Sequence, residues 1–468
     1  MSRRALRAAC GKRQVITVVA VLAVLLAAAS PAAAVQPRPD LTTCFWGGAA
    51  GAPPATNRLV SDLNELAFFG VAVLPRGGSI RFTHTFPYAR SVAWSVYDPF
   101  TFTPLDTLRD DELVADPGSV NPYVPGAPRQ ASNRAYTMTV TTARRPATGA
   151  APNTLYTEGK TVVAVFYRLY VPDRGRDRLG DAGLPDLSYR PFRWGPTLTN
   201  DRACVALNAG RAATGPLYDL VWNSTTVGLG PSYKALLGLK ADTPTFPART
   251  EGRWDVFFGF LQLARPFLRE AGLGAQAAAL PTQRVGPAVD WDSDSAVAVN
   301  YVDRKLGPDA GGHNLLVVRG TMPRTPRTVG GDPVMGGDVD MRYWSLCTMN
   351  AAPLGRTGSC LFDEQVPVDG ARRYTVVVGA PEDRPPNATA DCGVAWLDWS
   401  PDGDGYGRET AGTLVLRNQD SAPGFTQAIQ DVATAETERE VMGPYLPTQE
   451  YVAADAFAAR GCAGAAEN

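Results

Sequence analysis

Two tryptophans in the second half of the chain flank a carboxylate, and this pattern could bind a sugar. Trp396, Asp398 and Trp399 lie just before a turn at residues 401–403. In a β-strand, positions 396 and 399 face opposite sides, so one ring can be buried while the other offers a flat stacking face. Sugars present C–H surfaces together with hydroxyls, which suit an aromatic face beside a carboxylate. We therefore take these three residues as candidate ligand-binding residues.

Catalytic chemistry has weaker support. A serine hydrolase needs a histidine base and a nucleophile on a sharp turn, but the chain has two histidines, His84 and His313, and no G-x-S-x-G motif. A glycosidase needs two carboxylates that face each other across a cleft. Acidic residues recur at matching places, 110–112 and 363–364, but turn chemistry explains this recurrence better than catalysis does. We predict no catalytic residue.

Metal and cofactor sites are not predicted either. The segments 290–301 and 402–407 open with acidic residues at alternate positions, as calcium loops do, but each departs from the ligand pattern further on. The H-x-D/E spacing of metal-dependent double-stranded β-helix enzymes is missing. The cysteines form no C-x-x-C pair and no cluster with histidine, which argues against zinc. We therefore expect no metal and no cofactor.

The first residues read as a secretory signal peptide. A basic start is followed by an uncharged apolar run from Val15 to about Ala29, and the small residues 32–34 match an A-x-A cleavage pattern. We expect a signal peptide at 1–34, a mature chain that starts near Val35, and a secreted or cell-envelope location. The order Ser2-Arg3-Arg4 partly matches a twin-arginine signal, so the general secretory and twin-arginine routes both stay open.

Charge and cysteine usage fit an exported protein. The leader holds five of the 45 basic residues and no acidic one, so 40 basic residues face 46 acidic ones in the mature chain. This balance predicts no nucleic-acid partner and no membrane partner after signal cleavage. Six cysteines remain, an even number that favours disulfides. We predict a bridge between Cys347 and Cys360, and leave open the pairing of the other four, which are Cys44, Cys204, Cys392 and Cys462.

Short apolar runs rich in Val, Thr and aromatic residues, bounded by Gly, Pro and Asp, predict many strands. The predicted strands cover residues 79–86, 91–97, 136–141, 161–170, 314–319, 342–347, 374–378 and 413–416. Helical periodicity occurs at 57–69 and 253–271, and a shorter helix is expected at 424–433. The chain is therefore predicted to be mostly β.

An internal repeat organises these strands. A strand with tryptophan and serine, an acidic turn, a strand that starts with tyrosine and a strand that carries arginine occur twice in this order. We expect residues 78–172 and 313–420 to share one fold, with Trp94 on Trp344 and Arg168 on Arg417. The two tryptophans should then fill the cores of two sandwiches.

At these residues the sequence resembles a family. The order W-S-x-x-Y-D, acidic turn, strand and L/Y-R-x-Y-x-P resembles the jelly-roll domains of bacterial proteins catalogued only as domains of unknown function. The second half is similar to a wider set of exported hypothetical proteins. The resemblance covers residues 75–175 and 310–450 and departs at 153–156, where the pattern would carry a tryptophan and a proline. It implies a β-sandwich fold and no particular activity.

These observations predict a mainly β fold with two jelly-roll-like β-sandwich units and a partly helical linking segment. The expected bounds are 35–210 for the N-terminal unit with a short leading helix, 211–300 for the linking segment and 301–468 for the C-terminal unit. We expect an exported binding or cell-envelope protein with a glycan or small molecule in the groove between the sandwiches. The alternative is a secreted hydrolase that uses acidic residues.

Overall fold

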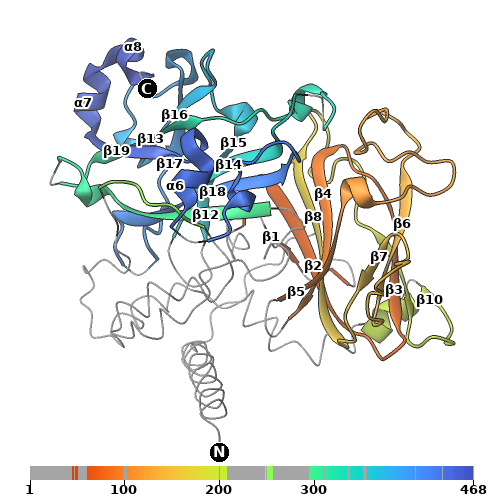
Figure 1. The fold of residues 1–468 in the computed structure, drawn as a ribbon. Helices are drawn as coiled ribbons and strands as arrows, with labels where there is room; N and C mark the ends of the chain where they lie inside the picture. The colour runs from red at the N-terminus through yellow and green to blue at the C-terminus, as the bar shows by residue number, and fades with distance from the viewer. Residues whose placement is uncertain are drawn as a thin grey trace, which may run out of the picture.

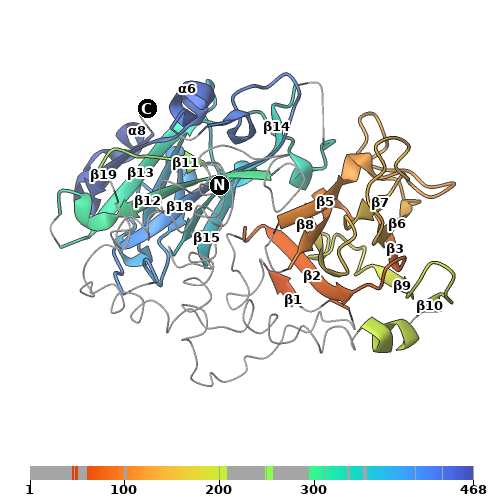
Figure 2. The same cartoon turned by 60° about the horizontal axis from the view of Figure 1, so that its bottom comes forward.

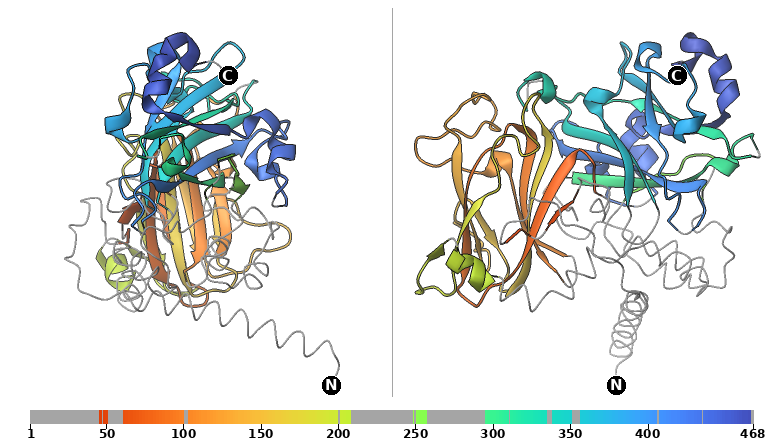
Figure 3. Two further views of the ribbon diagram at one scale, coloured as in Figure 1. Left: turned by 90° about the vertical axis from the view of Figure 1, so that its left-hand side faces the viewer. Right: turned by 180° about the vertical axis from the view of Figure 1, so that it is seen from behind.

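The computed structural model describes residues 45–46, 48–50, 61–99, 103–199, 201–207, 248, 250–256, 295–309, 311–334, 338–350, 356–405, 407–434 and 436–466. In these residues the chain is mainly β and forms two sandwiches that lie side by side (Figure 1). Figure 3 shows the same two bodies from the side and from behind. We call the unit of β1 to β10 the N-terminal sandwich and the unit of β11 to β19 the C-terminal sandwich.

The N-terminal sandwich consists of two five-stranded sheets. The first has the order β1-β2-β8-β4-β5, with bounds Gly48–Ala50, Glu65–Val73, Val162–Pro172, Ala89–Asp98 and Thr103–Arg109. The second has the order β10-β9-β3-β6-β7, with bounds Leu198–Thr199, Asp186–Arg190, Ser79–Thr85, Ala135–Thr141 and Thr154–Tyr156. Neighbouring strands are antiparallel except β6 and β7, which are parallel.

Aromatic side chains fill the space between these two sheets. Trp46, Phe82, Trp94 and Tyr167 are fully buried, and their ring centroids lie 4.9 to 6.3 Å apart in the contacting pairs. On β3 and β6, residues that point into this core alternate with polar residues that point outward. This period of two is what a sheet with one buried and one open face requires.

The C-terminal sandwich repeats this architecture. Its first sheet has the order β11-β12-β18-β14-β15, with bounds Asp255–Val256, Ser295–Asp303, Ala411–Ser421, Met341–Met349 and Thr357–Phe362. Its second has the order β17-β16-β13-β19, with bounds Val394–Asp398, Arg373–Gly379, Asn314–Thr321 and Thr448–Ala453. The pair β16 and β17 is parallel, as β6 and β7 are. The repeat predicted from the sequence is therefore present in the order and pairing of the strands, except that β10 has no counterpart in the C-terminal sandwich.

The register of the strands fixes which residues are equivalent. Arg168 on β8 lies opposite Ala93 on β4, and Arg417 on β18 lies opposite Ser345 on β14. On their other side, Ala93 lies opposite Arg109 of β5 and Ser345 lies opposite Phe362 of β15. Each of these two residues is followed directly by an acidic 3-10 turn, Asp110–Glu112 (η1) or Asp363–Gln365 (η5). Arg168 and Arg417 are thus equivalent, as expected.

The tryptophans are shifted against each other by two residues. In the register just described, Trp94 is equivalent to Leu346 and Trp344 to Val92, so the expected superposition of Trp94 on Trp344 is wrong. A shift of two keeps a side chain on the same face of the strand, so both rings still enter their cores. Both are fully buried, and each contacts the tyrosine that follows the first residue of β6 or β16.

Equivalent residues of the two sandwiches contact each other reciprocally across the surface where the sandwiches meet, which we call the seam. Arg90 on β4 is equivalent to Arg342 on β14, and the two turns supply Asp110 and Asp363. Arg90 Nη1 donates to Asp363 Oδ1 over 2.7 Å, and Arg342 donates to Asp110. The two sandwiches are therefore related by an approximate two-fold axis, as subunits of an isologous dimer are.

A second reciprocal set supports this symmetry. Ser91 is equivalent to Tyr343, and Tyr170 to Gln419. Gln419 Nε2 donates to Ser91 Oγ over 3.1 Å, while the rings of Tyr170 and Tyr343 lie 5.2 Å apart. The same pair of equivalent positions is therefore in contact at two places in the seam, through polar side chains at one and through aromatic side chains at the other.

Short helices lie in the connections. The remaining ones are η3 (Arg304–Leu306), η4 (Thr328–Gly330), η6 (Pro381–Asp383), η7 (Ala390–Cys392), η8 (Ile429–Asp431), α6 (Glu438–Met442), η9 (Gly443–Tyr445), α7 (Ala454–Ala459) and α8 (Gly461–Ala465), and residues 201–207 are also helical. In the described ranges no helix is long and apolar enough to cross a membrane.

The structure differs from three sequence predictions about helices and bounds. The leading helix at 57–69 is wrong, because residues 65–73 form β2, which is covered on both faces and therefore carries a continuous apolar run. The helix expected at 424–433 is a single 3-10 turn. β11 and β12 start at 255 and 295, inside the predicted linking segment, whose other residues from 211 to 294 lie largely outside the described ranges.

Two disulfides are described. Cys347 and Cys360 lie directly opposite each other on β14 and β15 and are bonded, which confirms the predicted bridge. Cys392 and Cys462 join η7 to α8. Cys204 is also disulfide-bonded. These bonds indicate an oxidising environment.

Candidate ligand-binding site

The structure brings Trp396 and Asp398 together at the end of β17. Trp396 Nε1 donates to Asp398 Oδ1 over 2.7 Å, and the Arg384 guanidinium lies 5.4 Å from the centre of the indole. Trp396 packs against the apolar cluster on the outer face of its sheet. One face of this indole is therefore covered by protein and the N–H is already bonded.

Trp399 faces the other side of the sheet. It is 6% exposed, belongs to the core of the C-terminal sandwich, and donates from Nε1 to the carbonyl oxygen of Glu409 over 2.9 Å. The two rings do lie on opposite sides, but neither presents a bare face beside Asp398. These three residues stay a sequence prediction, and a different surface offers the better-formed site.

The first acidic residue of each of the two recurring turns belongs to the seam. Asp110 and Asp363 are 0% and 6% exposed, and each accepts a backbone N–H of its own sandwich as well as the arginine of the other. Burial raises the pKa of Asp110 to about 6, although the Arg342 guanidinium lowers it. Burial also raises the pKa of Asp363. The pKa values of both carboxyl groups are raised because the contact between the sandwiches buries them. A substrate in solvent cannot reach them.

A third buried carboxylate also accepts hydrogen bonds across the seam. Asp62 is fully buried and its Oδ2 accepts bonds from Ser345 Oγ over 2.5 Å and from Tyr343 OH over 2.8 Å. Arg417 Nε lies 3.7 Å from the same oxygen. Among the described residues, the space where the sequence predicted a ligand groove is therefore occupied by side chains bonded to one another.

The two histidines are separate from each other and from the seam. His84 is buried between the rings of Tyr136 and Tyr167, and burial lowers the pKa of His84 to about 3. His313 is exposed, its Nδ1 lies 2.8 Å from Asp383 Oδ1, and this contact raises the pKa of His313. The buried ring has no access to solvent and the exposed one lies in a turn of the C-terminal sandwich.

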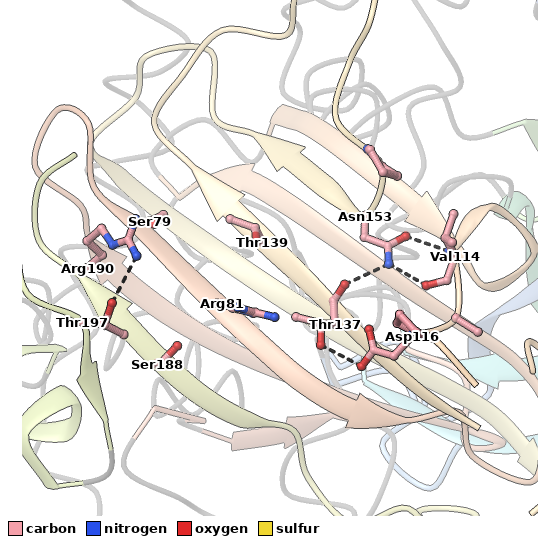
Figure 4. A pocket seen from close by; sticks show the side chains of 13 residues that line it. Ser79, Arg81, Val114, Asp116, Thr137, Thr139, Asn153, Ser188, Arg190 and Thr197 are labelled. Carbon is pink, nitrogen blue, oxygen red and sulfur yellow. Dashed lines mark hydrogen bonds between the residues drawn. The ribbon is translucent and has the colours of Figure 1, made fainter. Parts of the chain in front are cut away.

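A polar hollow of about 520 Å³ lies on the outer face of the N-terminal sandwich (Figure 4). Its floor is formed by the outward residues of β3, β6 and β9. Arg81 lies opposite Thr139 on one side and opposite Ser188 on the other, and Ser79 lies opposite Arg190. The alternation that buries every second residue of these strands in the core therefore gathers hydroxyls and guanidinium groups on the open face.

One wall of the hollow is fixed by an asparagine. Asn153 accepts from the Val114 N–H over 2.7 Å and donates to the carbonyls of Val114 and Thr137 over 2.7 and 2.8 Å. Its φ is 50°, a left-handed conformation that asparagine tolerates better than most residues. Next to it, Thr137 Oγ1 donates to Asp116 Oδ2 over 2.9 Å. This end of the hollow is rigid because its polar groups bond each other.

The other wall is the end of β9 and the start of β10, where Arg190 Nη2 donates to Thr197 Oγ1 over 3.2 Å. Figure 4 shows Arg81 between the two walls, with its guanidinium free of the dashed bonds. Arg81 is exposed, and its side chain makes no hydrogen bond or ion pair with the described residues. Among the residues that line the hollow, Asp116 is the single carboxylate and two arginines are present. The hollow therefore favours a polar ligand of neutral or negative charge.

The matching face of the C-terminal sandwich is closed. There Leu315, Val317 and Val377 point outward and are covered by Phe457 of α7 and Ala465 of α8. Figure 1 shows α7 and α8 on the side of the C-terminal sandwich that is remote from the N-terminal one. The same sheet thus carries an apolar, helix-covered face in one copy and a polar, open face in the other.

Sequence reasoning recognised residues 79–86 as a strand but not its outward residues as a site. The available signal was the contrast between the alternating SIRFTHT of β3 and the continuous apolar NLLVV of β13. Which outward residues meet in one hollow depends on the pairing of β3 with β6 and β9, which no local pattern reveals.

Comparison with known proteins places no activity on this chain. No family model matches it and no curated protein matches it. Among solved structures, a protein from Burkholderia cenocepacia described as uncharacterized is 13% identical, with a TM-score of 0.46, and the alignment covers 92% of this chain and 87% of that one. A protein from Vibrio parahaemolyticus is 10% identical, with a TM-score of 0.38, covering 88% of this chain and 92% of that one. Likenesses this distant carry no argument about function.

Proposed function

We propose that this chain is an exported binding protein whose ligand, a glycan or another hydroxyl-rich small molecule, occupies the polar hollow on the N-terminal sandwich. The observation that carries the proposal is the difference between the two copies of one sheet. A face that the C-terminal copy covers with two helices is left open in the N-terminal copy and lined with hydroxyl, amide and guanidinium groups. The volume of the hollow lies in the range of small-ligand sites, and its polar groups converge on one space, as the groups that orient a ligand do.

The composition of the hollow favours binding over hydrolysis. A glycosidase requires two carboxylates flanking the bond to be cleaved. Among the residues that line the hollow, Asp116 is the single carboxylate, and it already accepts the Thr137 hydroxyl. The alternative function of a secreted hydrolase has no comparable observation in its favour.

Export and a cell-envelope or extracellular location belong to the same proposal. The basic and apolar leader before Val35 and the disulfides both favour it. N-terminal sequencing of the protein recovered from outside the cytoplasm should give a chain that starts near Val35. A start at Ser2 in that fraction would refute the signal peptide.

The binding proposal is tested with the purified mature chain on an oligosaccharide array, followed by isothermal titration calorimetry with each saccharide retained. The variants Thr139→Val and Ser188→Ala each remove a hydroxyl from the floor and keep a strand-compatible side chain. We expect each to weaken binding by about tenfold, the loss that follows from a hydrogen bond of about 1.4 kcal/mol.

The matched control is Thr448→Val, which removes an exposed hydroxyl from an edge strand of the C-terminal sandwich. This variant should bind as the wild type does. Equal losses in all three variants, or binding that none of them changes, would place the ligand elsewhere. The absence of any saccharide binding would refute a glycan ligand, and the absence of binding to a panel of polyols and other hydroxyl-rich small molecules as well would refute the proposal.

A further inference from the structure

The loop between β9 and β10, whose two ends form one rim of the hollow, carries an exposed aromatic pair. Phe192 and Trp194 are 52% and 84% exposed. The loop leaves the hollow at Arg190 and returns to it at Thr197, and the bond between these two residues closes its base. In Figure 2 β9 and β10 lie at the edge of the N-terminal sandwich that is far from the seam, so this rim is not part of the contact between the sandwiches.

The shape of the loop is fixed. The Gly195 N–H donates to the carbonyl oxygen of Phe192 over 2.8 Å, which closes a tight turn. A Cβ added at Gly195 would lie 3.0 Å from the Phe192 ring, so this ring packs directly on the glycine. The Arg193 guanidinium lies 4.9 Å from the centre of the Trp194 ring. A large aromatic surface is thus held in water beside a polar hollow.

The residues that line the hollow carry a net positive charge. Arg81 lies in its centre and Arg190 at the wall next to the aromatic loop, against the single carboxylate of Asp116 at the opposite end. A planar guanidinium binds a carboxylate or phosphate group through paired hydrogen bonds. An exposed indole suits the C–H face of a sugar ring. Together these features suit a ligand that carries an acid group and a sugar ring.

We propose that the hollow binds an acidic saccharide, with Arg81 and Arg190 receiving its acid group and Trp194 stacking on an adjacent sugar ring. This inference rests on the proposed function and adds the chemical class of the ligand. Carboxylate and phosphate both fit the two guanidinium groups, so the shared chemistry is an anionic group on a sugar. The aromatic loop extends the site beyond the hollow to a second ring.

Isothermal titration calorimetry with four probes tests the acid preference. The probes are trigalacturonic acid, its fully methyl-esterified form, 6-phosphomaltotriose and maltotriose. The ester keeps the sugar ring surfaces of trigalacturonic acid and removes the charge, so the ratio of the two affinities measures the acid contribution alone. We expect an acidic probe to bind at least about tenfold more tightly than its neutral counterpart, because charge-assisted hydrogen bonds are stronger than neutral ones. The carboxylate and phosphate probes show which acid is preferred.

Three variants separate the roles of the side chains. Arg81→Gln should remove the preference for the acidic probe and leave the neutral one within about threefold, while Arg81→Lys should restore part of the preference because it keeps the charge. Trp194→Ala should weaken acidic and neutral probes alike, by about tenfold, as the loss of a stacking contact does. The control Arg174→Gln changes an exposed arginine of the same sandwich that does not line the hollow and should change nothing.

Two kinds of result would overturn the inference. If acidic and neutral probes bind equally and Arg81→Gln has no effect, the acidic ligand is wrong while the proposed binding function stands. If no acidic probe binds, the inference fails, and the oligosaccharide array then decides separately whether the proposed binding function stands. Binding to phosphatidylglycerol vesicles that depends on Trp194, without binding of any saccharide probe, would assign the aromatic loop to a lipid surface and would also overturn the inference.

Discussion

Removal of Arg342 should disrupt the seam more than any surface change of the same size. The side chain is 2% exposed and contacts two carboxylates of which one belongs to each sandwich, Asp110 directly and Asp420 over 3.2 Å. In the variant Arg342→Met, Asp110 stays buried without its cation. The methionine keeps most of the volume, so the measured effect is the loss of charge compensation rather than a cavity.

The expected loss follows from the cost of a buried charge without a partner. Breaking a buried ion pair by removing one member destabilises proteins by about 3–5 kcal/mol. Asp110 is fully buried and its pKa is already raised to about 6, so it should take up a proton more readily in the variant. The loss should therefore be smaller at pH 5 than at pH 8, because the protonated carboxyl needs no cation.

Urea unfolding followed by far-ultraviolet circular dichroism measures this loss at both pH values. The matched control is Arg373→Met, which breaks an ion pair with Asp369 on the surface, where the side chains are 50% and 37% exposed, and its effect should be far smaller. The symmetry adds a second check, because Arg90→Met removes the equivalent arginine and should cause a similar loss. Equal effects of Arg342→Met and Arg373→Met would show that the seam carboxylates are solvated and would refute the reasoning.

Three further predictions concern the cores and the sheets. Burial lowers the pKa of His84 to about 3, below its usual 6.5, so the unfolded chain binds a proton that the folded chain rejects and stability falls as the pH drops below 6.5. Between pH 6.5 and 5 this amounts to about 2 kcal/mol, and His84→Gln should flatten that part of the pH profile of urea unfolding; an unchanged profile would assign the dependence to other groups. Trp94→Ala and Trp344→Ala should each lower the unfolding free energy by about 3–5 kcal/mol through the cavity left behind, and a loss under about 1 kcal/mol in either would contradict its place in a core. Replacement of Cys347 and Cys360 by serine should cost about 3 kcal/mol, and peptide mapping without reductant should find these two residues in one linked pair.

Several features of this protein could be read from the sequence because they depend on neighbouring residues. Alternation and β-branched runs predict the positions of most strands. Two cysteines 13 residues apart predict a bridge, because consecutive antiparallel strands place residues at such a separation opposite each other. The ordered repeat predicted one fold twice, and Arg168 and Arg417 do occupy equivalent places. These patterns lie within one strand or in the order of consecutive strands, so they can be recognised without knowing which strands are hydrogen-bonded to each other.

Other sequence predictions failed where both faces of an element are covered. The helical periodicity at 57–69 predicts a helix, but β2 starts at Glu65 and is buried on both faces over most of its length, so its sequence shows no alternation that would mark it as a strand. The alignment of Trp94 with Trp344 was shifted by two residues, since an even shift leaves both rings in their cores and local pattern cannot detect it.

Only the tertiary structure decided how the two sandwiches meet and where a ligand could bind. Arg90 meets Asp363 and Arg342 meets Asp110 across more than 200 residues of chain, and their reciprocity follows from an approximate two-fold axis that no local spacing encodes. The hollow is likewise assembled from three strands and two walls that are distant in sequence. Period-two alternation determines that Arg81 points outward, but the pairing of β3 with β6 and β9 determines which polar side chains surround it.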